Sequence, residues 1–151
     1  MMTTTPDPDK PHLETDDRFP SGPWEGYFLE PRLSNRFRME LSLEFADGRM
    51  TGDGLDYVGP FVIHGRYDTN DGKCTWVKQY LGQHAVYYEG YNEGRGIWGT
   101  WEIRQIGRGG FHIWPEGMSG TSSEKAAESE DLPASIRFED EVPASLEPSL
   151  F

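Results

Sequence analysis

Four side chains that can donate or exchange protons lie close together in the sequence, at Lys78, Tyr80, His84 and Tyr88. A lysine beside phenols in a cavity of low dielectric constant has a lowered pKa and can donate a hydrogen bond to a carbonyl or carboxylate. A histidine exchanges protons near neutral pH. The set therefore predicts the polar part of a small-molecule site or an acid/base pair. The alternative is that Lys78 points to solvent and that the tyrosines pack as cross-strand aromatic pairs.

The spacing of these residues indicates which of them share a face of a strand. Side chains two apart on a strand point the same way, so Lys78 lies with Tyr80, and His84 lies with Tyr88. The two faces of the strand predicted at 74–81 carry Cys74, Trp76, Lys78 and Tyr80 on one side, and Thr75, Val77, Gln79 and Leu81 on the other. Neither face is plainly apolar. Such a strand is typical of a ligand-lining wall and also of an oligomer interface.

The segment around these residues is predicted to consist of strands. The clearest is 36–45, where polar and apolar residues alternate without a break before Ala46-Asp47-Gly48 supplies a hairpin turn. Further strands are predicted at 24–29, 49–55, 60–67, 74–81, 84–91, 97–106 and 110–114. The turns between them include Asn70-Asp71-Gly72, Gly82-Gln83, 92–96 and Gly107-Arg108-Gly109.

This pattern favours an all-β fold, an up-and-down antiparallel barrel of about eight strands. Eight strands enclose an interior that side chains fill or that holds one small ligand. Glycines within the predicted strands, such as Gly90 and Gly99, fit the sharp bends of a small barrel. The alternative is a two-sheet β-sandwich.

Composition divides the chain into three parts. All five Trp and all seven Tyr fall within 19–115, the predicted barrel domain. Residues 1–18 are predicted to be a disordered N-terminal arm, and residues 116–151 an acidic, mostly disordered C-terminal tail whose apolar residues are either solvated or docked on the barrel or a partner. Of the net charge of -12, the arm carries -3, the tail -7 and the domain only -2. A nearly neutral domain argues against nucleic-acid and anionic-membrane partners.

The cysteine content and the N-terminus bear on the compartment. Cys74 is the only cysteine, so no internal disulfide forms, which favours a reducing environment. The first residues have neither a basic region nor an apolar run, so no signal peptide or membrane span is predicted. We expect a cytoplasmic protein.

Other chemical constellations are weaker. The histidines His64, His84 and His112 lie on three predicted strands and could converge on zinc or haem, but no metal-ligand spacing supports this, so no metal or other cofactor is predicted. Asp53 and Asp56 are more simply the end of an irregular strand than a calcium loop. No nucleophile elbow is present, and Cys74 is expected to pack as a small residue.

A resemblance enters at Gly22-Pro23-Trp24, immediately before the first strand. It is similar to the Gly-x-Trp with which calycins open, the group of lipocalins, fatty-acid-binding proteins and avidins. The resemblance implies a ligand-binding barrel with Trp24 at its floor, under a cation that would be Arg104 or Arg108 here. The stretch 99–103 followed by 110–115 is also similar to small uncharacterised bacterial domains, and this resemblance indicates no particular activity.

We therefore expect a barrel that binds a small molecule without transforming it. Its polar residues are Lys78, Tyr80, His84 and Tyr88, and its apolar walls are Trp76, Trp101 and Phe111. One alternative is a small barrel enzyme in which His84 is the general acid/base and Lys78 or Tyr80 stabilises the developing charge. Another is an interaction module whose mixed outer face pairs with itself, as a homo-oligomer, or with another protein.

Overall fold

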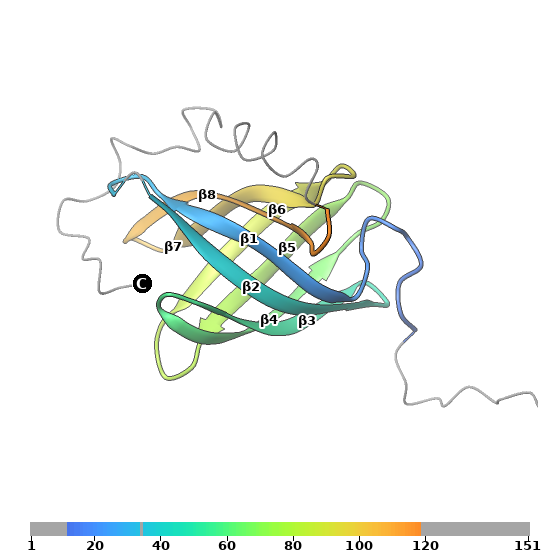
Figure 1. Cartoon of the computed structure of the whole chain (residues 1–151), viewed down its shortest axis with the longest axis horizontal. Helices are drawn as coiled ribbons and strands as arrows, with labels where there is room; N and C mark the ends of the chain where they lie inside the picture. The colour runs from blue at the N-terminus through green and yellow to red at the C-terminus, as the bar shows by residue number, and fades with distance from the viewer. Residues whose placement is uncertain (1–11, 34, 119–151) are drawn as a thin grey trace, which may run out of the picture.

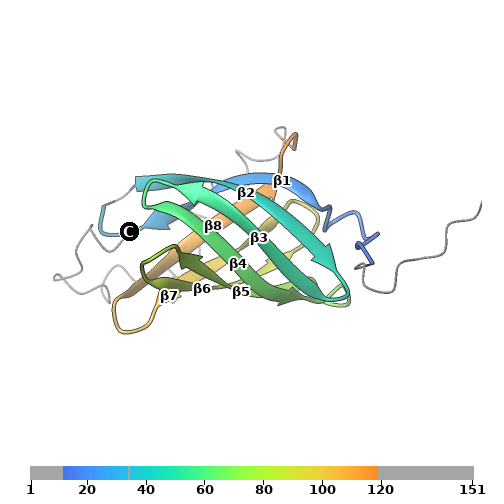
Figure 2. The same cartoon turned by 90° about the horizontal axis from the view of Figure 1, so that it is seen from below.

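A computed structural model describes residues 12–33 and 35–118, which form eight strands and no helix. The strands are β1 (Gly22–Glu30), β2 (Asn35–Ala46), β3 (Arg49–Asp56), β4 (Gly59–Tyr67), β5 (Lys73–Tyr80), β6 (Ala85–Asn92), β7 (Ile97–Ile103) and β8 (Gly107–Pro115). Each pairs antiparallel with the next, and β8 pairs with β1, which closes the barrel (Figures 1 and 2). The prediction of an all-β up-and-down barrel is confirmed, and closure excludes the sandwich. No helix among the described residues is long and apolar enough to span a membrane.

Alternation along the strands determines what lies inside. Along β5 the even-numbered residues Cys74, Trp76, Lys78 and Tyr80 are buried, while the residues between them are exposed or half-buried. On β6 the same holds for Val86, Tyr88, Gly90 and Asn92. Because side chains on a strand point alternately to its two faces, this parity places Lys78, Tyr80 and Tyr88 inside the barrel.

Two glycines mark a point where neighbouring strands approach closely. Gly90 and Gly99 are register partners on β6 and β7. A Cβ atom at Gly90 would lie 2.5 Å from the Trp98 carbonyl oxygen and 2.9 Å from the Phe111 ring, and one at Gly99 would lie 2.1 Å from the Glu89 carbonyl oxygen. Any larger residue would collide there, and Gly90 in addition leaves room for the Phe111 ring in the core.

The turn between β7 and β8 lies earlier than the sequence indicated. We expected it at Gly107-Arg108-Gly109, but these residues belong to β8, and the chain turns at 104–106 with Gln105 in the left-handed region (φ 64°). The physical reason is packing: Gly109 is buried under the Trp101 indole, where a Cβ would lie 2.8 Å from its Nε1. Glycine is needed there for close approach and not for the turn.

The barrel has two different ends (Figure 1). We call the end with the connections after β1, β3, β5 and β7 the mouth, and the other end the floor. At the floor, Trp24 is 1% exposed, donates its Nε1 hydrogen to the Pro20 carbonyl at 2.8 Å, and packs on Phe45 with ring centroids 5.5 Å apart.

Neither arginine that the resemblance implied as a cation over Trp24 lies near that residue. Arg108 is a register partner of Glu102 in the β7–β8 hairpin and Arg104 lies in its turn, whereas Trp24 pairs with Pro115 at the far end of β8. Both arginines are therefore at the mouth, and this prediction was wrong. The floor has Arg18 instead, whose guanidinium lies 5.3 Å from the Phe19 ring centroid.

Part of the predicted N-terminal arm contacts the floor. The Glu14 amide donates to the Phe45 carbonyl at 2.9 Å, and the Tyr67 hydroxyl donates to the Glu14 carboxylate at 2.6 Å. Arg18 donates to the Thr69 carbonyl at 2.6 Å. Residues 12–18 are thus tied to the barrel, and the rest of the predicted arm and residues 119–151 of the predicted tail lie outside the described residues.

Candidate functional site

Three polar side chains meet inside the barrel near the mouth. The Lys78 Nζ atom lies 2.8 Å from Asp56 Oδ2, and the Tyr80 hydroxyl donates to the same oxygen at 2.6 Å. The side chains of Lys78 and Asp56 are 1% and 0% exposed. We call Asp56, Lys78 and Tyr80 the polar centre. It combines an amine, a carboxylate and a phenol in a space that water does not reach.

Two strands that do not pair with each other supply the polar centre. Asp56 is the last residue of β3, where its Oδ1 accepts the Val58 amide hydrogen at 2.9 Å and so fixes the start of the turn into β4. Lys78 and Tyr80 come from β5, opposite Ile63 and Phe61 of β4. Their inward parity lets Asp56 and Lys78 meet across the interior although β4 separates their strands.

Four aromatic rings surround the Lys78 ammonium. Its Nζ lies 4.7 Å from the ring centroid of Phe28, 4.8 Å from that of Phe61, 4.9 Å from that of Tyr80 and 5.2 Å from that of Tyr88. The ring faces carry partial negative charge and offset part of the lost hydration of the cation. The ion pair with Asp56 has to offset the remaining loss of hydration.

Burial changes the proton affinity of each group at this centre. It lowers the pKa of Lys78 to about 8, although the nearby Asp56 charge acts in the opposite direction. Burial also raises the pKa of Tyr80 and of Tyr88 well above that of a free tyrosine, with the Asp56 charge adding to the effect. The two phenols stay protonated at any physiological pH, whereas Lys78 has a neutral fraction.

His84 lies beside the polar centre and not in it. It precedes β6, in the connection from β5, and not within a strand as predicted. Its ring centroid is 5.0 Å from that of Tyr80. Burial lowers the pKa of His84, and the Lys78 charge lowers it further. The neutral imidazole is therefore favoured, and a role for His84 as a general acid/base stays a prediction.

The predicted apolar walls pack against one another. Trp76 and Tyr88 stack with centroids 5.1 Å apart and an interplanar angle of 9°, and Phe111 meets both edge-on at 5.2 and 4.9 Å. Trp101 donates its Nε1 hydrogen to the Leu29 carbonyl at 2.8 Å. These residues and Tyr80 are all below 5% exposed. In this structure they form the core next to the polar centre, so a ligand would have to enter by displacing side chains.

A chain of three aromatic residues leads from the solvent-exposed mouth to the buried Phe28, which is 1% exposed. Tyr57, in the turn after Asp56, is 50% exposed and stacks on Phe37 with centroids 4.5 Å apart. Phe37 packs on Phe28 at 5.3 Å, and Phe28 lies against the Lys78 ammonium. We call Phe28, Phe37 and Tyr57 the aromatic rim. It is the layer between the polar centre and solvent at this end.

A second carboxylate lies at the mouth. Glu30, the last residue of β1, is 0% exposed, and its Oε1 accepts hydrogen bonds from the amide and Nε of Arg32 at 3.0 and 3.2 Å. Among the described residues, no hydrogen-bond partner reaches the buried Glu30 Oε2 or Arg32 Nη2 atoms. The Glu30 charge also helps to raise the pKa of Tyr57, after burial and Asp56.

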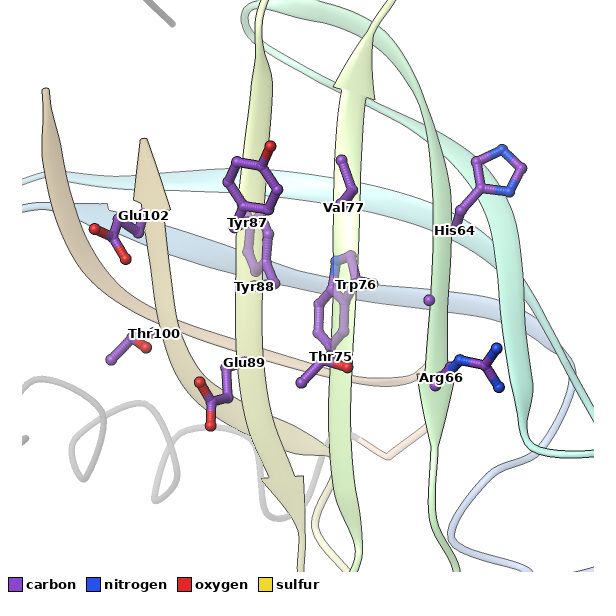
Figure 3. Close-up of a pocket in the computed structure, with 11 residues that line it drawn as sticks. His64, Arg66, Thr75, Trp76, Val77, Tyr87, Tyr88, Glu89, Thr100 and Glu102 are labelled. Carbon is purple, nitrogen blue, oxygen red and sulfur yellow. The ribbon is translucent and has the colours of Figure 1, made fainter. Parts of the chain in front are cut away.

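A separate groove lies on the outer surface of β4 to β7 (Figure 3). Its volume is about 440 Å³. The residues that line it are His64, Gly65, Arg66, Thr75, Trp76, Val77, Tyr87, Tyr88, Glu89, Thr100 and Glu102. The register aligns its outward side chains in two rows across the strands, His64, Val77, Tyr87, Glu102 and Arg66, Thr75, Glu89, Thr100. We call it the outer groove.

The other candidate sites, a histidine metal site, a calcium loop and a reactive cysteine, do not form among the described residues. His64 is exposed on the outer face of β4, and His112 packs against Tyr27 and Trp114 on the outer face of β8. The three histidines therefore do not converge, and no described group of three or more His, Cys, Asp or Glu residues is suited to hold a metal ion. Asp53 points outward, away from Asp56. Burial raises the pKa of the Cys74 thiol to about 12, so this cysteine is a poor nucleophile.

Sequence reasoning brought Lys78, Tyr80 and Tyr88 together correctly but missed the carboxylate. From the sequence, Asp56 is interpreted as the end of an irregular strand rather than as part of a calcium loop, and not as a partner of Lys78. The alternation along β3 could have identified Asp56 as an inward residue. The even-numbered residues of this strand, Met50, Gly52, Gly54 and Asp56, all point into the barrel. The rim residues and Glu30 carried no chemical motif.

Comparison of the chain with protein-family models, with curated proteins and with solved structures finds no match.

Proposed function

We propose that this protein binds an uncharged small molecule inside the mouth of the barrel, without transforming it. The polar group of the ligand would accept a hydrogen bond from Lys78, and its apolar body would lie among the aromatic rings around it. The observation that carries the proposal is the buried ion pair of Lys78 and Asp56 within an otherwise aromatic interior.

The stability of the folded barrel does not require a buried ion pair. Transfer of two ions out of water costs several kcal/mol for each ion, and apolar side chains of similar volume often serve a core equally well or better. The barrel already has a large aromatic core built from the same strands. A costly polar group beneath an accessible rim favours a role in recognition.

The charge balance of the polar centre indicates the ligand class. Lys78 and Asp56 neutralise each other, so an anionic ligand would add an uncompensated charge to a dry interior. A neutral carbonyl or ether oxygen adds none. Lys78 has three donor hydrogens, and the contacts of its Nζ are Asp56 at 2.8 Å and the weak acceptor Met39 Sδ at 3.5 Å. A ligand oxygen can take the place of the sulfur.

Entry would involve the aromatic rim. Tyr57 is half-exposed on a short turn, and Phe37 is only partly buried, so both can rotate outward without opening the hydrogen-bonded strands. Met39 borders the Lys78 ammonium, and its flexible side chain can adapt to a new neighbour. The site would form on binding by displacement of these three side chains.

The experiment is a fluorescence titration with two probes of similar size, the neutral ketone β-ionone and the anion decanoate. We expect β-ionone to quench tryptophan fluorescence saturably and to bind more tightly than decanoate. The variant Lys78→Met with Asp56→Asn should weaken β-ionone binding about tenfold, the effect of losing one good hydrogen bond. The matched control Tyr87→Ala, in the outer groove, should bind as the parent does. Absence of saturable binding, or equal binding by the polar-centre variant, would overturn the proposal.

The outer groove, with its mixed polar and apolar lining, favours a second candidate function, an interaction module that pairs with a copy of itself. Tyr87 is 52% exposed at its centre, with a cationic β4 side and an acidic β6 and β7 side. Two copies facing each other with parallel strands would set His64 of each against Glu102 of the other. Sedimentation at rising concentration tests this, and a constant monomer mass rejects it.

A further inference from the structure

We propose that Lys78 is a covalent anchor that captures an aldehyde ligand as an imine. This rests on the proposed function and deepens it, because it assigns a reactive class of carbonyl compound to the same site. The geometry that supports it is an amine, a proton acceptor and a proton donor gathered at one point, away from water.

The groups around the amine match the needs of imine formation. Asp56 Oδ2, 2.8 Å from Nζ, can accept a proton from the ammonium. The Tyr80 hydroxyl, 2.6 Å from the same oxygen, can share a proton with the carboxylate. Tyr88 is the other phenol beside Lys78, and His84 lies next to Tyr80. Each proton that the reaction moves thus has a group within reach.

The steps balance without any oxidant or reductant. Asp56 takes a proton from the Lys78 ammonium, and the nitrogen lone pair then forms a bond to the aldehyde carbon while the carbonyl oxygen takes up a proton. The resulting carbinolamine loses its oxygen as water, and a carbon–nitrogen double bond forms. One aldehyde and one ammonium give one protonated imine and one water. The positive imine keeps Asp56 as its counter-ion.

The surroundings of Lys78 favour capture over the same reaction at the surface. The rings of Phe28, Phe61, Tyr80 and Tyr88 exclude the water that would hydrolyse the imine. The pKa of Lys78, lowered to about 8 by burial, leaves a useful fraction of neutral amine near neutral pH. Lys73 on the same strand differs, because its Nζ is partly exposed, 3.3 Å from Glu89, and that contact raises its pKa.

The test uses the full chain and 3-phenylpropanal, an uncharged aldehyde with an aromatic body. Protein and aldehyde are incubated at pH 7.5, reduced with borohydride and analysed by intact mass and peptide mapping. The chain offers Lys10, Lys73, Lys78 and Lys125 as competing sites. We expect one adduct per chain, with at least about ten times more label at Lys78 than at Lys73, because the neutral fraction of Lys78 at pH 7.5 is larger by a factor on the order of a hundred or more. No variant is needed, so folding does not confound the result.

The matched alcohol, 3-phenylpropan-1-ol, separates this inference from the proposed function. It can fill the site but cannot form an imine. Saturable binding of the alcohol without a Lys78 adduct from the aldehyde would overturn covalent capture and leave the binding barrel standing. Absence of both would reject both. Label spread evenly over Lys73 and Lys78 would also overturn capture, because it would show ordinary amine reactivity. In the expected case, the alcohol competes with Lys78 labelling and leaves Lys73 labelling unchanged.

Discussion

The two lysines of β5 show what the inside and the outside of this barrel do to one side chain. Lys73 points outward and lies 3.3 Å from Glu89, in contact with water, and this contact raises its pKa. Lys78 points inward and lies 2.8 Å from Asp56, and burial lowers its pKa although the ion pair is shorter. The comparison teaches that solvent, more than the partner, decides the chemistry of each amine.

The same contrast extends to the two candidate sites. The polar centre and the outer groove use alternate residues of β5, and Trp76 and Tyr88 lie between the two sites. Charges in the outer groove are hydrated, so single changes there should cost little. Charges at the polar centre have only each other, so removal of one partner should be costly and removal of both should not.

The largest expected effect follows removal of the buried carboxylate. Asp56→Ala leaves the Lys78 amine and the Tyr80 hydroxyl without their shared acceptor. We expect the free energy of unfolding to fall by about 3–5 kcal/mol in urea denaturation. Glu102→Ala in the outer groove is the control and should change it by less than about 0.5 kcal/mol. Similar losses in both variants would remove the distinction between the two regions.

The next effect is a dependence on pH that belongs to Lys78. Its pKa is about 8 in the folded protein, below the 10.5 of the free side chain, so between these values the unfolded chain binds the extra proton. Stability from this group therefore rises with pH across that window, by at most about 1.4 kcal/mol per pH unit, and is lost as pH falls through 8. The difference in unfolding free energy between the parent and Lys78→Met should grow accordingly. A flat difference between pH 8 and 10 contradicts the buried assignment.

A smaller change is expected when both charges are removed together. Asn in place of Asp56 can still accept the Val58 amide hydrogen, and Met in place of Lys78 fills a similar volume. We expect Lys78→Met with Asp56→Asn to unfold within about 1 kcal/mol of the parent, far from Asp56→Ala. If the double variant is as unstable as Asp56→Ala, the ion pair serves the core, and the argument for recognition fails.

The smallest effect is expected at the centre of the outer groove. Tyr87 is 52% exposed, so Tyr87→Ala should change the unfolding free energy by no more than about 0.5 kcal/mol. If the outer groove mediates self-association, the same variant should reduce the mass measured by sedimentation. If the unfolding free energy fell by several kcal/mol, Tyr87 would contribute to the core as Tyr88 does, and the distinction between the two faces of β6 would fail.

The features predicted from sequence were local, and those missed were not. The unbroken alternation over 36–45 located β2, and the spacing of Lys78 and Tyr80 placed them on one face. The partner Asp56 comes from β3 and meets Lys78 only because the sheet closes, which periodicity within one strand does not show. The same limit explains Arg104 and Arg108, which were assigned to the floor without knowledge of the register of β8. The turn predicted at 107–109 was wrong because the sequence does not distinguish a glycine needed for close packing, as Gly109 is, from one needed for a turn.

The register between Trp24 and Pro115 also determines how the barrel can be held. The first and last strands of the described chain lie side by side at the floor, because Trp24 pairs with Pro115. A linker joined directly before β1 or directly after β8 would therefore leave from the floor, with the aromatic rim at the opposite end of the barrel.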